Sequence, residues 1–182
     1  MQTTEIQTAG TRAQRVVASS DLHRGAEEPQ QYLTFILGDE MFAIGILSIR
    51  EIIEYGFVTD VPMTPPFIRG VLNLRGAVVP VVDLAVRFGR KAYGNSKRTC
   101  IVIVDIELAA GRQQMGVVVD AVSEVLEVAP ADIEPPPAFG ARIRSVFIKG
   151  MGKINGKFVV ILDLNSVLSV GEVDVLANMG AS

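Results

Sequence analysis

The stretch Gly70–Leu84, GVLNLRGAVVPVVDL, contains a glycine, a short apolar segment, a turn at Arg75-Gly76, an apolar run typical of a buried strand, and an acidic residue that ends the run. A related stretch, GMGKINGKFVVILDL, occupies Gly150–Leu164. The repeat predicts that the chain contains two copies of one β unit, because self-similarity on this scale indicates duplication. A shift of eighty residues places Phe67, Ile68, Gly70, Gly76, Val79, Asp83 and Leu84 on Phe147, Ile148, Gly150, Gly156, Val159, Asp163 and Leu164.

A second alignment supports the duplication. With a shift of seventy-three residues, FAIGILSIREIIE at Phe42–Glu54 lies over MGVVVDAVSEVLE at Met115–Glu127. The difference between the two shifts places an insertion in the proline-rich stretch 128–145, where a loop lengthens easily. Each copy then contributes about five short strands, and we expect these to close into a small barrel because closure removes exposed strand edges.

The composition favours a β-rich interior. Of the 182 residues, 49% are hydrophobic but only 6% are aromatic, so the core must consist mainly of Val, Ile and Leu, which suit pleated sheets. The formal net charge of −3, without a basic stripe, argues against a nucleic-acid partner. No apolar run reaches the about 20 residues that span a bilayer, and the N-terminus has no secretory pattern. We therefore expect a cytoplasmic protein with no direct membrane insertion.

The termini and the single Cys and His carry little signal. Residues 1–30 lack a sustained apolar period and are expected to form a disordered tail that contains His23, and residues 172–182 are expected to form a second tail or a short helix. Cys100 lies in an apolar run and is expected to be a small buried residue. With one His and one Cys in the chain, we predict neither a metal site nor a cofactor.

Local patterns predict the elements around the repeat. Gln31–Leu37 and Met41–Leu47 are apolar runs separated by Gly-Asp-Glu, which predicts a hairpin. The segment 46–55, ILSIREIIEY, fits either one face of a short helix or a twisted strand after a bend. Three prolines in 60–70 favour an extended connector. Pro80 inside an apolar strand indicates an edge or bulged strand.

Two carboxylates are candidates for catalysis. Asp83 and Asp163 occupy equivalent positions and could form an acid–base pair in a carboxylate enzyme. Each follows an apolar strand and precedes a helix-like segment, however, where Asp is a favourable N-cap. The chain has no nucleophile elbow, no phosphate-binding glycine loop and no reactive Cys–His pattern. We therefore predict a binding module and not an enzyme, and the carboxylate enzyme is kept as a remote alternative.

Four segments together resemble a known family. FIRGVLNLRGAVVPVVDL, GVVVDAVSEVLEV, PPPAF and FIKGMGKINGKFVVILDLNSVL closely resemble the CheW-type coupling proteins of bacterial chemotaxis, over about Tyr32–Ser169. The resemblance implies a mostly all-β, CheW-like domain over 31–171, made of two SH3-like five-stranded β-barrel subdomains with short helices. The repeat blocks of these subdomains are 35–88 and 99–168.

The resemblance also implies a function. CheW-type proteins are adaptors that couple the histidine kinase CheA, through its regulatory domain, to the cytoplasmic hairpin tips of transmembrane chemoreceptors. This chain is then expected at the inner face of the membrane in receptor arrays, with further copies of itself as additional ring partners. An adaptor of a different chemosensory array, such as one that controls pilus motility, is an alternative with the same fold and mechanism.

Partner-binding residues follow from the resemblance by position. We predict that Glu51 and Arg75 form an ion pair on the first unit, beside Gly76, which supplies a positive φ. Ordinary core packing remains open for the isoleucines and valines, a solvated turn for Arg75, and burial for Phe139. A departure from some members of the family is Glu134, which stands before the prolines where they have a basic residue. The complete set of expected protein-binding residues is Ile46, Ile49, Glu51, Ile52, Arg69, Arg75, Gly76, Val117, Val119 and Phe139.

Overall fold

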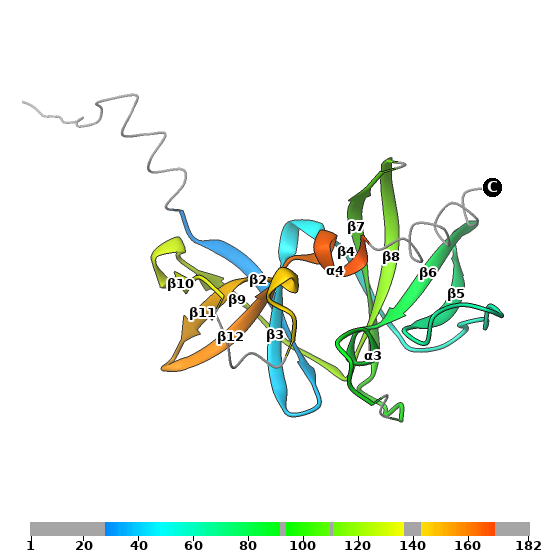
Figure 1. The fold of residues 1–182 in the computed structure, drawn as a ribbon, viewed down its shortest axis with the longest axis horizontal. Coiled ribbons are helices and arrows are strands. Elements are labelled where there is room, and N and C mark those ends of the chain that lie inside the picture. The colour runs from blue at the N-terminus through cyan, green and yellow to red at the C-terminus, as the bar shows by residue number, and fades with distance from the viewer. Residues whose placement is uncertain (1–27, 92–93, 110, 137–142, 170–182) are drawn as a thin grey trace, which may run out of the picture.

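The computed structural model describes residues 28–91, 94–109, 111–136 and 143–169 (Figure 1). Most of the predicted tails, 1–30 and 172–182, and the whole stretch 137–142 with Phe139 lie outside the described residues. The strands are β2 (Gln30–Leu37), β3 (Glu40–Gly45), β4 (Ile49–Glu54), β5 (Ile68–Leu74), β6 (Ala77–Asp83), β7 (Cys100–Leu108), β8 (Gly111–Val119), β9 (Ala121–Val128), β10 (Ile133–Glu134), β11 (Ile148–Ile154) and β12 (Lys157–Leu162). The helices are α3 (Leu84–Arg87) and α4 (Leu164–Leu168), with 3₁₀ turns η1 (Ile46–Ser48), η2 (Pro130–Asp132) and η3 (Ser145–Phe147).

The strands form two sheets that lie side by side (Figure 1). One sheet has the order β10-β11-β12-β3-β2-β9, and the other has the order β4-β7-β8-β6-β5. The two alignments of the sequence make β2–β3 the counterpart of β7–β8, β4 the counterpart of β9, and β5–β6 the counterpart of β11–β12. The order of the five-stranded sheet therefore recurs in the other sheet, which adds only the short β10. The predicted mostly β fold with two duplicated β subdomains is confirmed.

The subdomains and the repeat copies are nevertheless different units. Each sheet combines the hairpin of one copy with the remaining strands of the other copy: β2–β3 pairs with β9 and β12, and β7–β8 pairs with β4 and β6. The hairpins are thus exchanged reciprocally within one chain. The expectation that each copy closes on itself is corrected by this topology.

Each sheet is closed by the chain that leaves its edge strand. After β4 the chain turns back across the far edge, where Thr59 and Val71 of β5 exchange backbone hydrogen bonds of 2.7 and 2.8 Å. In the other subdomain β10 follows β9 and pairs antiparallel with β11. The same segment of each copy therefore covers the strand edge that would otherwise stay unpaired.

Two equivalent glycines permit this closure. Gly70 has a φ of +144°, and a Cβ placed there would fall on the carbonyl oxygen of Thr59. A Cβ at Gly150 would come within 2.5 Å of Ile133 Cγ2 and 3.0 Å of Glu134 O. Both glycines also follow a register shift in their strand. The repeated glycine is explained by the close approach of the closing segment, which leaves no room for a side chain.

We predict that Gly70→Ala lowers the free energy of unfolding by at least about 2 kcal/mol, because the methyl group meets backbone and the φ is disfavoured for alanine. Gly150→Ala is destabilising but less so, since one of its two neighbours is a side chain. The control is Gly45→Ala, where φ is −62° and nothing lies within 4 Å, so stability changes by no more than about 0.5 kcal/mol. Urea unfolding measures all three, and equal stability of the Gly70 and Gly45 variants would contradict the closure.

The largest hydrophobic core lies between the subdomains. Each subdomain has a small interior core, and the exchanged hairpins turn their other faces toward a shared core. A row of aromatic rings runs through it, from Phe35 to Phe42, Phe88 and Phe147, with centroids 6.1, 5.7 and 5.7 Å apart. Helix α4 extends the shared core by contacting β7 of the opposite sheet. Cys100, expected to be buried, is half-buried against this core.

Val117 and Val119 belong to the shared core. Both are among the residues predicted to bind a partner, but both are fully buried on β8. Successive side chains of a strand point to opposite faces, and in β8 one face meets the shared core while the other, with Val118, meets the subdomain interior. The prediction that these two valines contact a partner is therefore wrong.

Other local predictions are settled by the topology. The segment 46–55 forms the turn η1 followed by β4, so the strand alternative is correct. Pro80 does not lie on an edge strand, because β6 stands between β8 and β5. Val71, the residue of β5 opposite Pro80, makes its backbone hydrogen bonds to Thr59, so Val71 and Pro80 form a non-hydrogen-bonded pair. On the other side of β6, pairing with β8 starts only at Val81. The missing N–H of Pro80 therefore removes no ladder bond to β5.

Candidate protein-interaction surface

The turn between β5 and β6 presents Arg75 to solvent. Arg75 and Gly76 both have positive φ, 53° and 87°, as a two-residue type I′ hairpin requires. The side chain of Asn73 accepts a hydrogen bond of 3.0 Å from the backbone N–H of Gly76 and braces the turn. The positive φ predicted for Gly76 is confirmed. The Arg75 side chain, 73% exposed, is therefore displayed on a well-defined hairpin tip.

Glu51 of β4 faces this tip and forms the predicted ion pair. Arg75 Nη1 donates to Glu51 Oε1 at 2.9 Å, and Arg75 Nη2 donates to Glu51 Oε2 at 2.8 Å. This bidentate geometry aligns two parallel hydrogen bonds and fixes both side chains in one plane. The pair thus connects β4 to the β5–β6 hairpin on the surface of one subdomain. Its role in partner binding stays a prediction.

The ion pair changes the acid–base properties of both groups. Hydrogen bonds from Arg75 lower the pKa of Glu51 below its ordinary value of 4.5, and the carboxylate raises the pKa of Arg75. Because the pKa of Glu51 is lower in the folded chain than in the unfolded chain, the contribution of the pair is fully present above pH 4.5. It is lost as the pH falls through the folded pKa. At neutral pH the pair is intact.

We predict that a ¹³C-detected NMR titration of the Glu51 carboxylate gives a pKa below 4.5 in the wild type and a value closer to 4.5 in Arg75→Gln. The glutamine keeps much of the length of the side chain but removes the charge. An unchanged Glu51 pKa in the variant would contradict the pair in solution.

The three predicted isoleucines differ in their surroundings. Ile49 is half-buried and packs against the shared core, and Ile46 in η1 is also half-buried. Ile52, next to Glu51, is 42% exposed on β4. Val78, which follows the turn on β6, is also partly exposed. Ile52 is the member of the trio whose side chain is most available to a partner.

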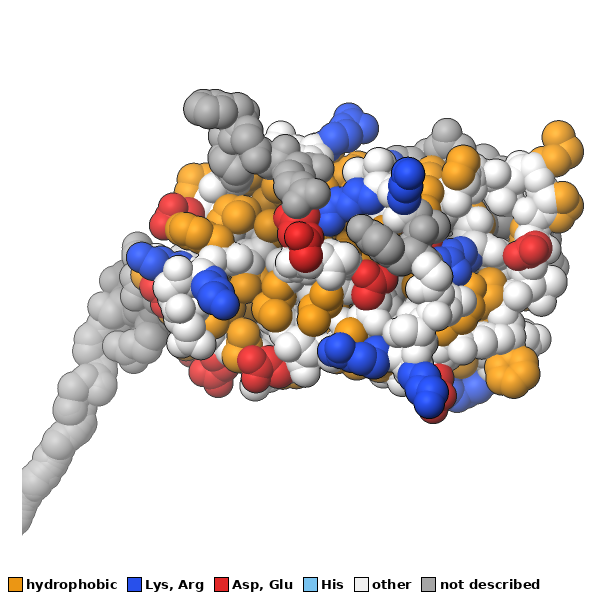
Figure 2. All heavy atoms as spheres, turned by 90° about the horizontal axis from the view of Figure 1, so that it is seen from below, with side chains coloured by type: hydrophobic (Ala, Val, Ile, Leu, Met, Phe, Trp, Pro, Cys, Tyr) orange, Lys and Arg blue, Asp and Glu red, His pale blue; other side chains and the backbone are white. Residues whose placement is uncertain are grey.

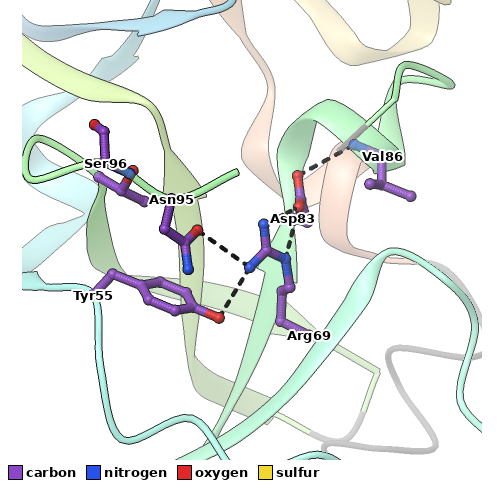
Figure 3. Close-up of polar contacts among 7 residues, drawn as sticks. Tyr55, Arg69, Asp83, Val86, Asn95 and Ser96 are labelled. Atoms are coloured by element: carbon purple, nitrogen blue, oxygen red, sulfur yellow. Dashed lines mark hydrogen bonds and ion pairs between the residues drawn. The ribbon is translucent and has the colours of Figure 1, made fainter. Parts of the chain in front are cut away.

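Arg69 is occupied inside its own subdomain (Figure 3). Its Nε donates to Asp83 Oδ2 at 2.8 Å, and its Nη1 donates to the Tyr55 hydroxyl at 2.9 Å and to Asn95 Oδ1 at 3.5 Å. Burial works against the charge of Arg69, but the hydrogen bonds and the attraction of Asp83 outweigh it and raise the pKa of Arg69. Asp83 also accepts from the N–H of Val86 at 3.3 Å. Arg69 therefore ties the start of α3 to Tyr55, which follows β4, and to Asn95, which precedes β7. Its part in partner binding stays a prediction.

The two equivalent aspartates act as helix caps. Asp83 caps α3 through Val86, and Asp163 caps α4 by accepting from the N–H of Ser166 at 3.2 Å. Their backbone N–H groups donate to Phe67 O and Phe147 O, at 2.7 and 2.9 Å. The predicted N-caps are confirmed, and each carboxylate serves its own subdomain, so the geometry does not favour the acid–base pair of the alternative.

The surface has no dominant charge on the face drawn in Figure 2, where acidic and basic side chains are interspersed and hydrophobic side chains reach solvent in several places. Within the described ranges, no group of three His, Cys, Asp or Glu side chains could hold a metal ion. Among the same residues, no helix is long and apolar enough to cross a membrane.

Sequence reasoning missed two exposed residues in the connector between β4 and β5. Phe57 and Met63 are fully exposed, and both have a positive φ. The signal that could have identified them is the isolated placement of a large apolar residue among Gly, Thr, Asp and Pro in 56–66. An apolar residue in such a setting has few neighbours against which to pack.

Comparisons with known proteins agree with the fold. A family model described as a CheW-like domain matches residues 31–172. The chain is 34% identical over 153 residues to a chemotaxis protein CheW of Klebsiella aerogenes, covering 84% of this chain and 90% of that protein. It is also 34% identical over 150 residues to a chemotaxis protein CheW of Rhizobium meliloti, covering 82% and 92%. The crystal structure of the scaffolding protein TtCheW from Thermoanaerobacter tengcongensis is similar with a TM-score of 0.72 and 36% identity, over 80% of this chain and 96% of that one.

Proposed function

The chain belongs to the CheW family of chemotaxis coupling proteins, and from this membership we propose that it is a non-enzymatic adaptor between the histidine kinase CheA and transmembrane chemoreceptors. In this proposal its partners are the regulatory domain of the kinase and the cytoplasmic hairpin tip of the receptor, with further copies of the chain as ring partners. It acts in the cytoplasm, at the inner face of the membrane, and does not itself enter the bilayer. Receptor control of kinase activity passes through these contacts.

The observation that carries the proposal is the Arg75–Glu51 ion pair. Its hydrogen bonds of 2.8 and 2.9 Å join two exposed elements, a setting in which ion pairs contribute little to folding. A bidentate pair on a braced type I′ turn does, however, hold its charges in fixed positions, and fixed charges select the orientation of a bound protein. The exposed Ile52 beside Glu51 adds an apolar contact to the same surface.

The shared core supports the second requirement of a coupling protein. Because the hairpins are exchanged, the two subdomains are joined through one hydrophobic core and not through a linker alone. A partner on one subdomain then keeps a defined orientation relative to a partner on the other. Weak single contacts held at fixed geometry add through avidity, and two different surfaces used head to tail close into rings when the rotation permits.

An adaptor of another chemosensory array would use the same fold and the same surface. Which array the chain serves is decided by which kinase and receptor of its own organism bind it. The carboxylate-enzyme alternative is not favoured, since Asp83 and Asp163 are engaged as caps of separate helices.

The test is kinase autophosphorylation in a reconstituted mixture of the cognate kinase, receptor cytoplasmic fragments assembled on vesicles, and this protein. We expect wild-type protein to raise the autophosphorylation rate at least about tenfold when receptor is present and to have little effect without it. Arg75→Glu places two carboxylates opposite each other and should lose most of this activation, because like charges at an interface select against the partner.

The matched control is Arg112→Glu. Arg112 also forms an exposed pair, with Glu107 at 3.2 Å, near the tip of the β7–β8 hairpin of the same subdomain. Its reversal changes the net charge equally and should leave activation within about twofold of wild type. Equal loss in both variants would show a nonspecific charge effect, and wild-type protein that activates nothing would reject the proposed function.

A further inference from the structure

The connector between β4 and β5 exposes two large apolar side chains completely. Phe57 and Met63 have no solvent protection from the rest of the chain, although each lies only a few residues from the sheet. Single exposed hydrophobic residues are common, but a phenylalanine and a methionine six positions apart on one connector form a pair. Figure 2 also shows hydrophobic side chains that protrude at the end of the molecule where β5 and β6 lie.

The backbone at both residues is strained. Phe57 has a φ of 57° and Met63 a φ of 61°, in the left-handed region that bulky side chains rarely adopt. Met63 follows Pro62 in a turn at the position where Gly or Asn is favoured. A glycine at either position would relieve the strain and remove an exposed apolar side chain. Folding alone therefore does not account for Phe57 and Met63, and strain of this kind indicates a functional constraint.

The connector holds these side chains firmly. Between them, Thr59 is bound to Val71 of β5 by two backbone hydrogen bonds, and Thr64 Oγ1 donates to Val61 O at 3.0 Å just after Met63. Close to Phe57, the hydroxyl of Tyr55 accepts from Arg69. Side chains on such a braced segment lose little conformational entropy when they are buried by a partner.

The charges carried by the connector itself indicate the kind of partner. Glu54 and Asp60 are exposed and make no ion pair within the described residues, and no Lys or Arg occurs between Glu51 and Ile68. A complementary surface would surround an apolar pocket with basic residues, because opposite charges at the rim set orientation and association rate. The shape agrees, since two protruding side chains fit a pocket in a globular domain, whereas a receptor helix is itself convex and requires a groove.

We propose that Phe57 and Met63 are anchor residues that insert into an apolar pocket with a basic rim on the regulatory domain of the kinase. This assignment rests on the proposed function and deepens it, because it gives the kinase its own contact beside the Arg75–Glu51 surface. Their strained backbone and exposed side chains lower folding stability, and the same side chains contribute to binding, as residues at functional sites often do.

The experiment measures binding of the full-length protein to the cognate kinase and, separately, to the receptor cytoplasmic fragment, by isothermal titration calorimetry. The variants are Phe57→Gly and Met63→Gly, with Phe158→Ser as the control because Phe158 is an exposed phenylalanine of the other subdomain. We expect each glycine variant to weaken kinase binding at least about tenfold and to leave receptor binding within about twofold. Their thermal unfolding midpoints should equal or exceed that of the wild type, and Phe158→Ser should leave kinase binding within about twofold.

Each other result overturns the assignment. Kinase affinity that stays within about twofold in both glycine variants means that the side chains do not anchor the kinase. Unfolding midpoints that fall mean that the side chains serve the fold, and equal losses for both partners mean a general disturbance of the surface. Wild-type protein that binds neither partner rejects the proposed function together with this assignment, whereas wild-type binding with unaffected variants rejects this assignment alone.

Discussion

The shared hydrophobic core between the two exchanged hairpins is the constraint on which the rest of the structure depends. Each subdomain alone has only a small interior, built around Leu72 and Ile103 in one sheet and around Tyr32 and Ile161 in the other. The hairpins β2–β3 and β7–β8 have one face in these interiors and the other face in the shared core. Removing either hairpin would dismantle one sheet directly and expose the shared core of both, so neither subdomain is an independent folding unit.

The junction also shows how duplication produced a unique arrangement. Phe67 and Phe147 occupy equivalent positions, and the guanidinium of Arg87 lies over both rings, 5.0 and 4.6 Å from their centroids. Arg87 Nε also donates to the carbonyl of Val167, which is the residue equivalent to Arg87 in the other copy. One arginine thus binds both copies where they meet, and its cation–π contacts favour a single relative orientation of the subdomains. A fixed orientation is what a coupling adaptor requires, because partners held on different subdomains must keep a defined geometry.

Much of this architecture was predictable because duplicated residues mark duplicated geometry. Gly76 and Gly156 form type I′ turns, Asp83 and Asp163 cap helices, and the Arg75–Glu51 pair forms where position suggested it. The hairpin exchange was not predictable, because both copies carry the same apolar pattern and either hairpin could pair with the remaining strands of either copy. The prediction that Val117 contacts a partner was wrong for a related reason. A strand buried on both faces is a continuous apolar run in the sequence, so the sequence does not show whether a given face meets the shared core or a partner. The strained positions of Phe57 and Met63 violate local preference, and local preference is all that a single sequence offers there.

Exchange of the hairpins makes the two subdomains one cooperative unit, and differential scanning calorimetry of the full chain measures that cooperativity. We expect a single endotherm whose calorimetric enthalpy equals its van't Hoff enthalpy, because unfolding of one sheet removes a hairpin or its partner strands from the other. Two resolved transitions, or a calorimetric enthalpy about twice the van't Hoff enthalpy, would show instead that the subdomains unfold independently.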